Sequence, residues 1–230
     1  MKREYWIIPI VALTTIALLP INAMLAPKTG ISISDHPAVN QMAAGQLLSL
    51  CLAAAVLLIV RFVNPDGFEK YWRPGAFSAP AEKVGWLGVK AGESWRSVGS
   101  AFALFITLGT AAFMYFGVYK STPINWQAAL PWVLLFSISN SFSEEMLTRF
   151  SLAAGLDGVA SKARICLWSA AIFGGIHYFG TPGGPLGMLM AGFLGWLLAK
   201  SVVETKGFGW AWLIHFLQDV VILFAFLGKE

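Results

Sequence analysis

Long apolar segments recur along this chain, and charged residues, prolines and glycines separate them. A helix needs about 20 apolar residues to cross a bilayer, so several such segments predict a helix bundle in a membrane. We predict seven spanning helices, at about 5–26, 39–63, 98–119, 126–155, 162–179, 186–203 and 208–227. Of the 230 residues, 57% are hydrophobic and 12% are charged, which excludes an ordinary soluble domain. The predicted fold class is all-α, a polytopic transmembrane helix bundle.

The N-terminus has features of a signal peptide, because Lys2 and Arg3 precede an apolar run. The run is long, however, and Pro27 directly follows the one small-residue site at which cleavage is plausible. We therefore expect this segment to be retained as the first helix.

One long polar connection, 64–97, separates the second and third predicted helices. It contains three prolines and mixes basic residues with Trp72, Trp86 and Trp95, a pattern typical of a membrane interface. We predict a solvated loop that is anchored among lipid headgroups. The chain 1–230 is then a single membrane domain. Accessory helices and this loop occupy 1–125, and a core that carries the distinctive motifs occupies 126–227.

The basic residues predict the orientation of the bundle. With the N-terminus in the cytoplasm, thirteen of the 16 lysines and arginines fall on the inner side and three on the outer side. This bias follows the positive-inside rule, and the odd number of helices puts the C-terminus outside. The net charge of +4 is spread over the connections, so nucleic acid is not an expected partner.

Five ionisable side chains lie well inside three of the predicted helices, where charge is costly. They are Glu144, Glu145, His177, His215 and Asp219. One buried polar residue is usually explained by a hydrogen bond between helices. Five of them on three helices favour a functional site in the membrane.

Spacing separates the expected roles of these residues. Glu145 and Arg149 are four apart, so we predict an internal ion pair on one helix face. Glu144 points about 100° away from its neighbour, which leaves it free to face a cavity and act as a base. His215 and Asp219 are also four apart, so the carboxylate can orient the imidazole.

Three motifs follow one another along the late helices: Glu-Glu-x-x-x-Arg, Phe-x-x-x-His and His-x-x-x-Asp. They are formed by Glu144, Glu145 and Arg149, then Phe173 and His177, then His215 and Asp219. In order, spacing and membrane setting, over about 126–227, they resemble the CPBP family. This family comprises CAAX prenyl-endopeptidases and bacteriocin-processing or immunity proteins, and is also called the Abi family.

The resemblance implies an intramembrane glutamate protease. It implies that Glu144 activates water, that His177 helps to position that water, and that the last motif stabilises the oxyanion through His215 and position 219. The CAAX endopeptidases have asparagine at that last position, where this chain has Asp219. A carboxylate donates to an oxyanion only when it is protonated, so Asp219 is either neutral or orients His215.

The resemblance also implies a membrane-embedded or lipid-anchored protein substrate, and a setting in a bacterial inner (cytoplasmic) membrane. No cofactor is expected. Two histidines and a carboxylate could ligate zinc, but the chain has no His-Glu-x-x-His and the candidates come from three helices, so we favour a metal-free mechanism. Alternatives to an enzyme are a scaffold or immunity protein that keeps the motifs for packing, and a small transporter with a proton relay.

The motifs must also lie at one depth in the membrane. At 1.5 Å per residue, Glu144 lies roughly 16 Å from the end of its predicted helix at Gly155, and His177 roughly 20 Å beyond Arg164. The site therefore requires the fourth helix to continue past Arg149 to Gly155.

Overall fold

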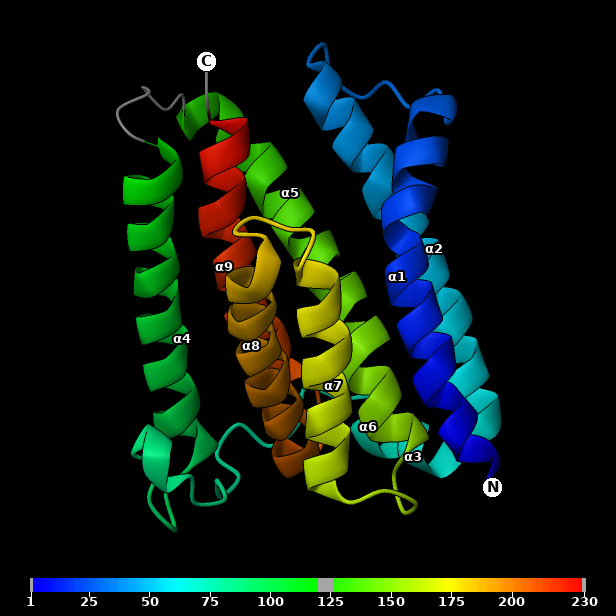
Figure 1. Ribbon diagram of the computed structural model, residues 1–230, viewed down its shortest axis with the longest axis vertical. Helices are drawn as coiled ribbons and strands as arrows, with labels where there is room; N and C mark the ends of the chain where they lie inside the picture. Colours follow the sequence, from blue (N-terminus) through cyan, green and yellow to red (C-terminus); the bar gives the residue numbers. More distant parts are fainter. Residues whose placement is uncertain (1, 120–125, 229–230) are drawn as a thin grey trace.

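The computed structural model describes residues 2–119 and 126–228. Over these residues the regular structure is helical, apart from two isolated β-bridges between residues 80 and 94 and between 84 and 89. The long helices run side by side along the longest axis of the molecule (Figure 1). The chain is thus a polytopic helical membrane bundle, as predicted.

The helices are as follows: α1 (Ile7–Leu25), α2 (Pro37–Val63), α3 (Pro65–Tyr71), α4 (Trp95–Phe113), α5 (Trp126–Glu145), α6 (Ser151–Gly155), α7 (Lys162–His177), α8 (Gly184–Thr205) and α9 (Gly209–Leu227). Short 3-10 helices cover Arg3–Trp6, Ala26–Lys28 and Gly85–Leu87. Two π-helical segments cover Met114–Tyr119 and Met146–Phe150.

Within the described residues, five helices are long and apolar enough to cross a membrane. They are Arg3–Lys28, Pro37–Val63, Trp95–Gly117, Gly184–Thr205 and Gly209–Leu227. The other two predicted spans correspond to α5 and α7, which run alongside these five (Figure 1). α5 is rich in polar residues, and the 16 residues of α7 reach only about 24 Å. Of the seven predicted spans, five are therefore long and apolar enough in the structure to cross a membrane.

The fourth predicted helix does continue past Arg149. The π-helical segment Met146–Phe150 joins α5 to α6, so the rod from 126 to 155 is helical throughout. Such a π segment inserts an i→i+5 turn and is frequent at functional sites. Here it lies directly after the glutamate pair. α5 packs against α2 and α9, which places the pair between the two halves of the bundle.

The prediction of a solvated loop for 64–97 is only partly correct, because most of its residues are exposed but the connection also contains α3 and several buried residues. Much of the connection is folded against the end of the bundle that carries the N-terminus, and Ala81, Val84, Val89 and Trp95 are buried. The indole Nε1 of Trp95 donates to Glu204 Oε2 on α8 at 2.7 Å. Glu204 lies 109 residues from Trp95 in sequence, so the composition of the connection alone looks like that of an exposed loop. Trp72 and Trp86 do remain exposed.

A second contact fixes the cap at α3. Lys70 Nζ lies 2.8 Å from Asp157 Oδ1, and Tyr71 donates its hydroxyl to the same carboxylate oxygen at 3.2 Å. Burial, together with the Asp157 charge, raises the pKa of the Tyr71 phenol above its ordinary value, so the phenol stays protonated as a donor. We call this end of the molecule the N-terminal end, and the end with the α1–α2 connection the opposite end (Figure 1).

Small residues bring α7 and α8 into close contact. A Cβ added at Gly174 would lie 2.7 Å from the carbonyl oxygen of Met188, and one at Gly195 would lie 3.1 Å from the Cβ of Phe173. Ser169 Oγ donates to the Gly195 carbonyl at 3.1 Å. Glycines on both helices therefore let the backbones of α7 and α8 approach closely.

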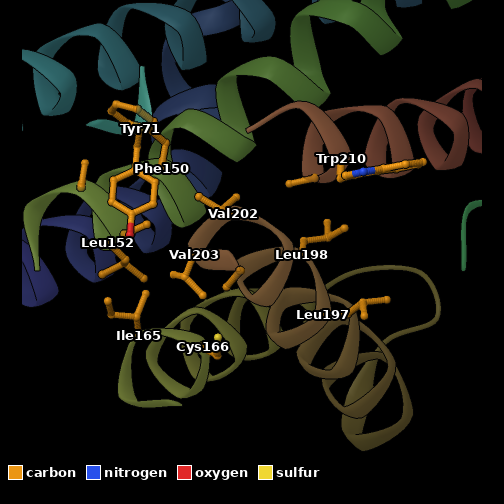
Figure 2. Packing of buried hydrophobic residues seen from close by; sticks show 14 of the residues in the cluster. Tyr71, Phe150, Leu152, Ile165, Cys166, Leu197, Leu198, Val202, Val203 and Trp210 are labelled. Carbon is orange, nitrogen blue, oxygen red and sulfur yellow. The ribbon is translucent and has the colours of Figure 1, made fainter. Parts of the chain in front are cut away.

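The main apolar core lies toward the N-terminal end. Figure 2 shows Tyr71 and Phe150 near Leu152, with Val202 and Val203 of α8 beside them. This core holds α6, α7 and α8 together beneath the polar residues described next.

Candidate active site

Glu145 is the centre of a fully buried ionic cluster. Its Oε1 lies 2.7 Å from His215 Nδ1 on α9 and 3.2 Å from Arg149 Nη1, one turn along its own helix. The side chains of Glu145 and Arg149 both have 0% exposure. The structure therefore contains the ion pair predicted from their spacing, and adds an imidazole to it.

Arg149 links this cluster to α7. Its guanidinium carbon lies 3.7 Å from the ring centroid of Phe173, and Nη1 donates to Thr148 Oγ1 at 2.6 Å. A buried guanidinium loses several kcal/mol of hydration, which a paired carboxylate and a cation–π contact of about 2 kcal/mol partly offset. Nε and Nη2 of Arg149 have no hydrogen-bond partner among the described residues. Phe173 thus supports Arg149, and through it the orientation of Glu145.

His215 is held from both sides of its ring. A carboxylate only accepts hydrogen bonds, so Nδ1 donates its proton to Glu145. Nε2 then faces two other carboxylates, with Glu144 Oε2 at 3.7 Å and Asp219 Oδ1 at 3.6 Å. Both distances exceed a hydrogen bond, so space remains between these three groups.

Glu144 differs from its neighbour in exposure. Its side chain is 29% exposed, whereas that of Glu145 is fully buried. It lines a large cavity, and its Oε1 accepts a hydrogen bond of 3.2 Å from Asn140 Nδ2. Of the two glutamates, Glu144 is therefore the one that can reach a substrate or a water molecule.

Asn140 is a site residue that sequence reasoning missed. Its Nδ2 donates to Glu144 Oε1 at 3.2 Å and to Asp219 Oδ2 at 3.1 Å, so it bridges α5 and α9. Its Oδ1 accepts from Gln46 Nε2 of α2 at 3.1 Å. One signal could have found it: an asparagine inside an apolar helix, four residues before the predicted base.

His177 lies on the cavity wall with one nitrogen occupied. Its Nδ1 is 2.8 Å from the carbonyl oxygen of Phe173. A carbonyl only accepts, so Nδ1 carries a proton, and a neutral ring keeps Nε2 free as an acceptor. His177 and Glu144 line the same two cavities, which is the arrangement expected for two residues that handle one water molecule.

Two cavities meet at Glu144, His177 and Asn140. The larger has a volume of about 670 Å³ and lies among α2, α4, α5, α7, α8 and α9, with mostly apolar walls. The smaller, of about 210 Å³, lies among α1, α2, α5 and α7. Gln218 fixes the wall of the larger one, because its side chain bonds Thr110 at 2.5 Å and Thr107 at 2.9 Å on α4.

All seven residues of the three motifs are thus brought together by α5, its π-helical extension, α7 and α9. On α9, His215 lies close to both Glu144 and Asp219. On α7, His177 lines the same cavities as Glu144. Across the described residues, no group of three or more histidine, cysteine or acidic side chains is arranged to hold a metal ion. The arrangement offers an accessible carboxylate, an imidazole acceptor and a fixed second imidazole, which is a set suited to acid–base hydrolysis.

A comparison with known protein families supports the resemblance to a membrane protease for residues 125–221. Residues 125–221 match the family described as type II CAAX prenyl endopeptidase Rce1-like. No curated protein and no solved structure matched the chain. The matched segment begins at α5, ends within α9 and contains every residue of the three motifs. The match supports placing this segment in the CPBP family of CAAX-type membrane proteases.

Proposed function

We propose that this protein hydrolyses a peptide bond in a membrane-embedded or lipid-anchored protein, and that Glu144 takes a proton from the attacking water. The observation that carries the proposal is the contrast between the two glutamates. Glu145 is locked by Arg149 and His215, whereas Glu144 lies on the cavity wall with His177. A base must reach the proton that it abstracts, and Glu144 meets that condition.

His177 positions the water. With Nδ1 donating to Phe173, a neutral His177 can accept a hydrogen bond from water through Nε2, while Glu144 accepts a second. A water held at both protons has its lone pair free for attack on the scissile carbonyl. The proton taken by Glu144 then passes to the leaving amine.

His215 stabilises the oxyanion, and Asp219 is a positioning residue. With Nδ1 engaged by Glu145, Nε2 of His215 can donate to an oxyanion in the doubly protonated ring. Asp219 Oδ2 accepts from Asn140, and Oδ1 lies 3.6 Å from His215 Nε2. This geometry supports the orienting role for Asp219 over direct donation to the oxyanion.

The large cavity suggests the apolar part of the substrate. Its walls include Ile106, Phe113, Phe193, Ile222 and Phe226 beside the carboxylates. We propose that the lipid or apolar segment of a CAAX-type substrate lies here, with the scissile bond at Glu144. The volume of about 670 Å³ is within the range of sites for small molecules and lipid chains.

The orientation is part of the proposal. Exposed basic residues Arg61, Arg73, Lys83 and Lys90 lie at or near the N-terminal end of the bundle, which supports a cytoplasmic position for that end. A bacterial inner membrane is the proposed location.

The test uses protein reconstituted in liposomes with fluorogenic peptides that end in a CAAX sequence, with and without a prenyl group on the cysteine. Mass spectrometry of the products gives the cleavage position. We expect cleavage of the prenylated peptide by wild type, with a rate at least tenfold higher than for the unmodified peptide. The exposed surface variant Glu82→Gln is the matched control and retains this activity.

A non-catalytic scaffold predicts a different result. In that case, wild type and Glu144→Gln both leave every peptide intact, and the substitution acts only through protein level. Cleavage by the wild type that is lost in a folded Glu144→Gln variant excludes the scaffold. If a chelator inhibits cleavage and zinc restores it, the mechanism depends on a metal and the metal-free mechanism is wrong.

A further inference from the structure

The smaller cavity is lined by polar side chains of α1 and α2 in addition to apolar ones. Thr15 and Asn22 of α1, Ser49 of α2 and Asn140 line it, and Glu144 and His177 lie at its inner wall. A third cavity of about 380 Å³ shares Asn22, Ser49 and Asn140 with it, and adds Gln41 and Gln46 of α2. Together the two cavities place several amides and hydroxyls among apolar side chains such as Leu18, Leu19 and Phe179, and we call the two cavities the polar passage.

The polar passage runs toward the opposite end of the bundle. The third cavity also contacts Ala26 and Ala38, which flank the α1–α2 connection. Ser49 lies 12 residues into α2, or about 18 Å from the start of that helix, so the passage extends deep into the bundle. In Figure 1 α1 and α2 lie together on one side of α5.

One amide in the polar passage lacks a protein partner. Asn22 Oδ1 is buried and has no hydrogen-bond partner among the described residues. An unpaired amide oxygen between membrane helices is unfavourable, and polar residues in such positions mark pathways for water or ions. Gly45 lines the third cavity beside Asn22, and a Cβ there would lie 3.7 Å from the Asn22 side chain, in ordinary van der Waals contact. A larger side chain at 45 would therefore fill this part of the passage.

The N-terminal end beneath the site is closed by aromatic rings. Phe150 packs edge-on against Phe68 and Trp72 at centroid distances of 5.2 and 5.5 Å. Phe208 contacts Trp72 and Phe142 at 6.2 Å each. Met146, Leu147, Leu152 and Leu156 are fully buried around them. These apolar groups separate Glu144 from the N-terminal end, whereas amides and hydroxyls connect it to the opposite end.

We propose that the polar passage supplies water to Glu144 from the opposite end of the bundle, along α1 and α2. The proposal rests on hydrolysis at Glu144 as its function. It assigns α1 and α2, which lie outside the matched segment, a role in the reaction. It also explains how a site within hydrocarbon can receive one water per turnover while an apolar substrate fills the larger cavity.

The first test measures access by chemistry that does not require activity. In a background with Cys51→Ala and Cys166→Ala, single cysteines at Asn22 and Ser49 are exposed to a charged, membrane-impermeant thiol reagent from each side of oriented vesicles. Leu47→Cys is the matched control, because Leu47 lies at the same depth on α2, is 51% exposed and lines none of the three cavities. Ser32→Cys and Lys83→Cys report the opposite end and the N-terminal end.

We expect Asn22→Cys and Ser49→Cys to react at least tenfold faster than Leu47→Cys, and from the side on which Ser32→Cys reacts. Reaction of Ser49→Cys no faster than Leu47→Cys, or from the Lys83→Cys side, overturns the proposal. Ser49→Cys changes one atom, so a failure of Asn22→Cys to fold leaves the test intact.

The second test narrows the passage. Gly45→Phe places a ring against Asn22 and should lower kcat at least tenfold with KM unchanged, since Gly45 lines the third cavity and not the larger one. Leu47→Phe places the same ring on the lipid-facing side of α2 and should leave kcat unchanged. A normal kcat in folded Gly45→Phe overturns the passage as the water supply. Labelling of Ser49→Cys together with full activity of Glu144→Gln would instead refute the glutamate assignment and leave the passage in place.

Discussion

Glu144 and Glu145 are adjacent in sequence but lie in different environments. Glu145 is fully buried between Arg149 and His215, and Glu144 is 29% exposed at the junction of two cavities. A helix turns by about 100° per residue, so neighbouring side chains cannot share one face. This rotation places one carboxylate in a buried ion pair and the other on a cavity wall, and the two should respond differently to the same substitution.

Glu145→Gln should destabilise the fold. The substitution leaves the Arg149 guanidinium buried without a counter-charge, and breaking a buried pair in this way costs about 3–5 kcal/mol. Thermal unfolding in detergent should show a clear fall in Tm, and Glu144→Gln should unfold within a degree or two of wild type. A Glu145→Gln variant with the Tm of wild type would show that the ion pair does not hold the helices together.

Asn140→Leu should slow catalysis more than it reduces stability. Asn140 donates to both Glu144 and Asp219, and each hydrogen bond to a charged group contributes about 1.5–3 kcal/mol. Loss of one such bond in the transition state corresponds to roughly a 10–150-fold lower kcat. Steady-state kinetics on the peptide reporter checks this, and Ile138→Leu, at a 48% exposed position of the same helix, is the comparison variant. A kcat for Asn140→Leu within twofold of wild type would remove Asn140 from the site.

Asp219→Asn and Asp219→Leu should separate the two roles considered for this residue. As a positioning residue, Asp219 needs an oxygen that accepts from Asn140, and asparagine keeps one while leucine does not. We expect Asp219→Asn to retain kcat within tenfold and Asp219→Leu to lose more than that, with a changed pH profile, because a carboxylate near His215 is removed. Equal loss in both variants would mean that the negative charge itself is required.

Local spacing predicted much of the site, and long-range contacts account for what it missed. The four-residue spacing of Glu145 and Arg149 predicted their ion pair, and the helical rotation predicted that Glu144 would face elsewhere. Asn140 and Gln46 were missed because their hydrogen bond joins α5 to α2, over 94 residues of sequence. The contact of Glu145 with His215 spans 70 residues and has no local signal either.

For the fold as well, local sequence predicted one part, and long-range contacts explain the part that was missed. Apolar runs predicted the long helices, because a segment that crosses the bilayer must itself be apolar over its whole length. The 64–97 connection was predicted as a solvated loop because its composition is polar and rich in proline and glycine. Its burial depends on Trp95 reaching Glu204, a partner on α8 that composition does not reveal.

The most direct test of the account compares Glu144→Gln with Glu82→Gln in the same liposomes, with the prenylated peptide as substrate. Glutamine keeps the shape and the hydrogen bond from Asn140 but cannot take a proton at neutral pH. The account predicts that Glu144→Gln lowers kcat by at least 100-fold with an unchanged Tm, and that Glu82→Gln cleaves at the wild-type rate. A folded Glu144→Gln protein that cleaves the peptide at the wild-type rate would contradict it.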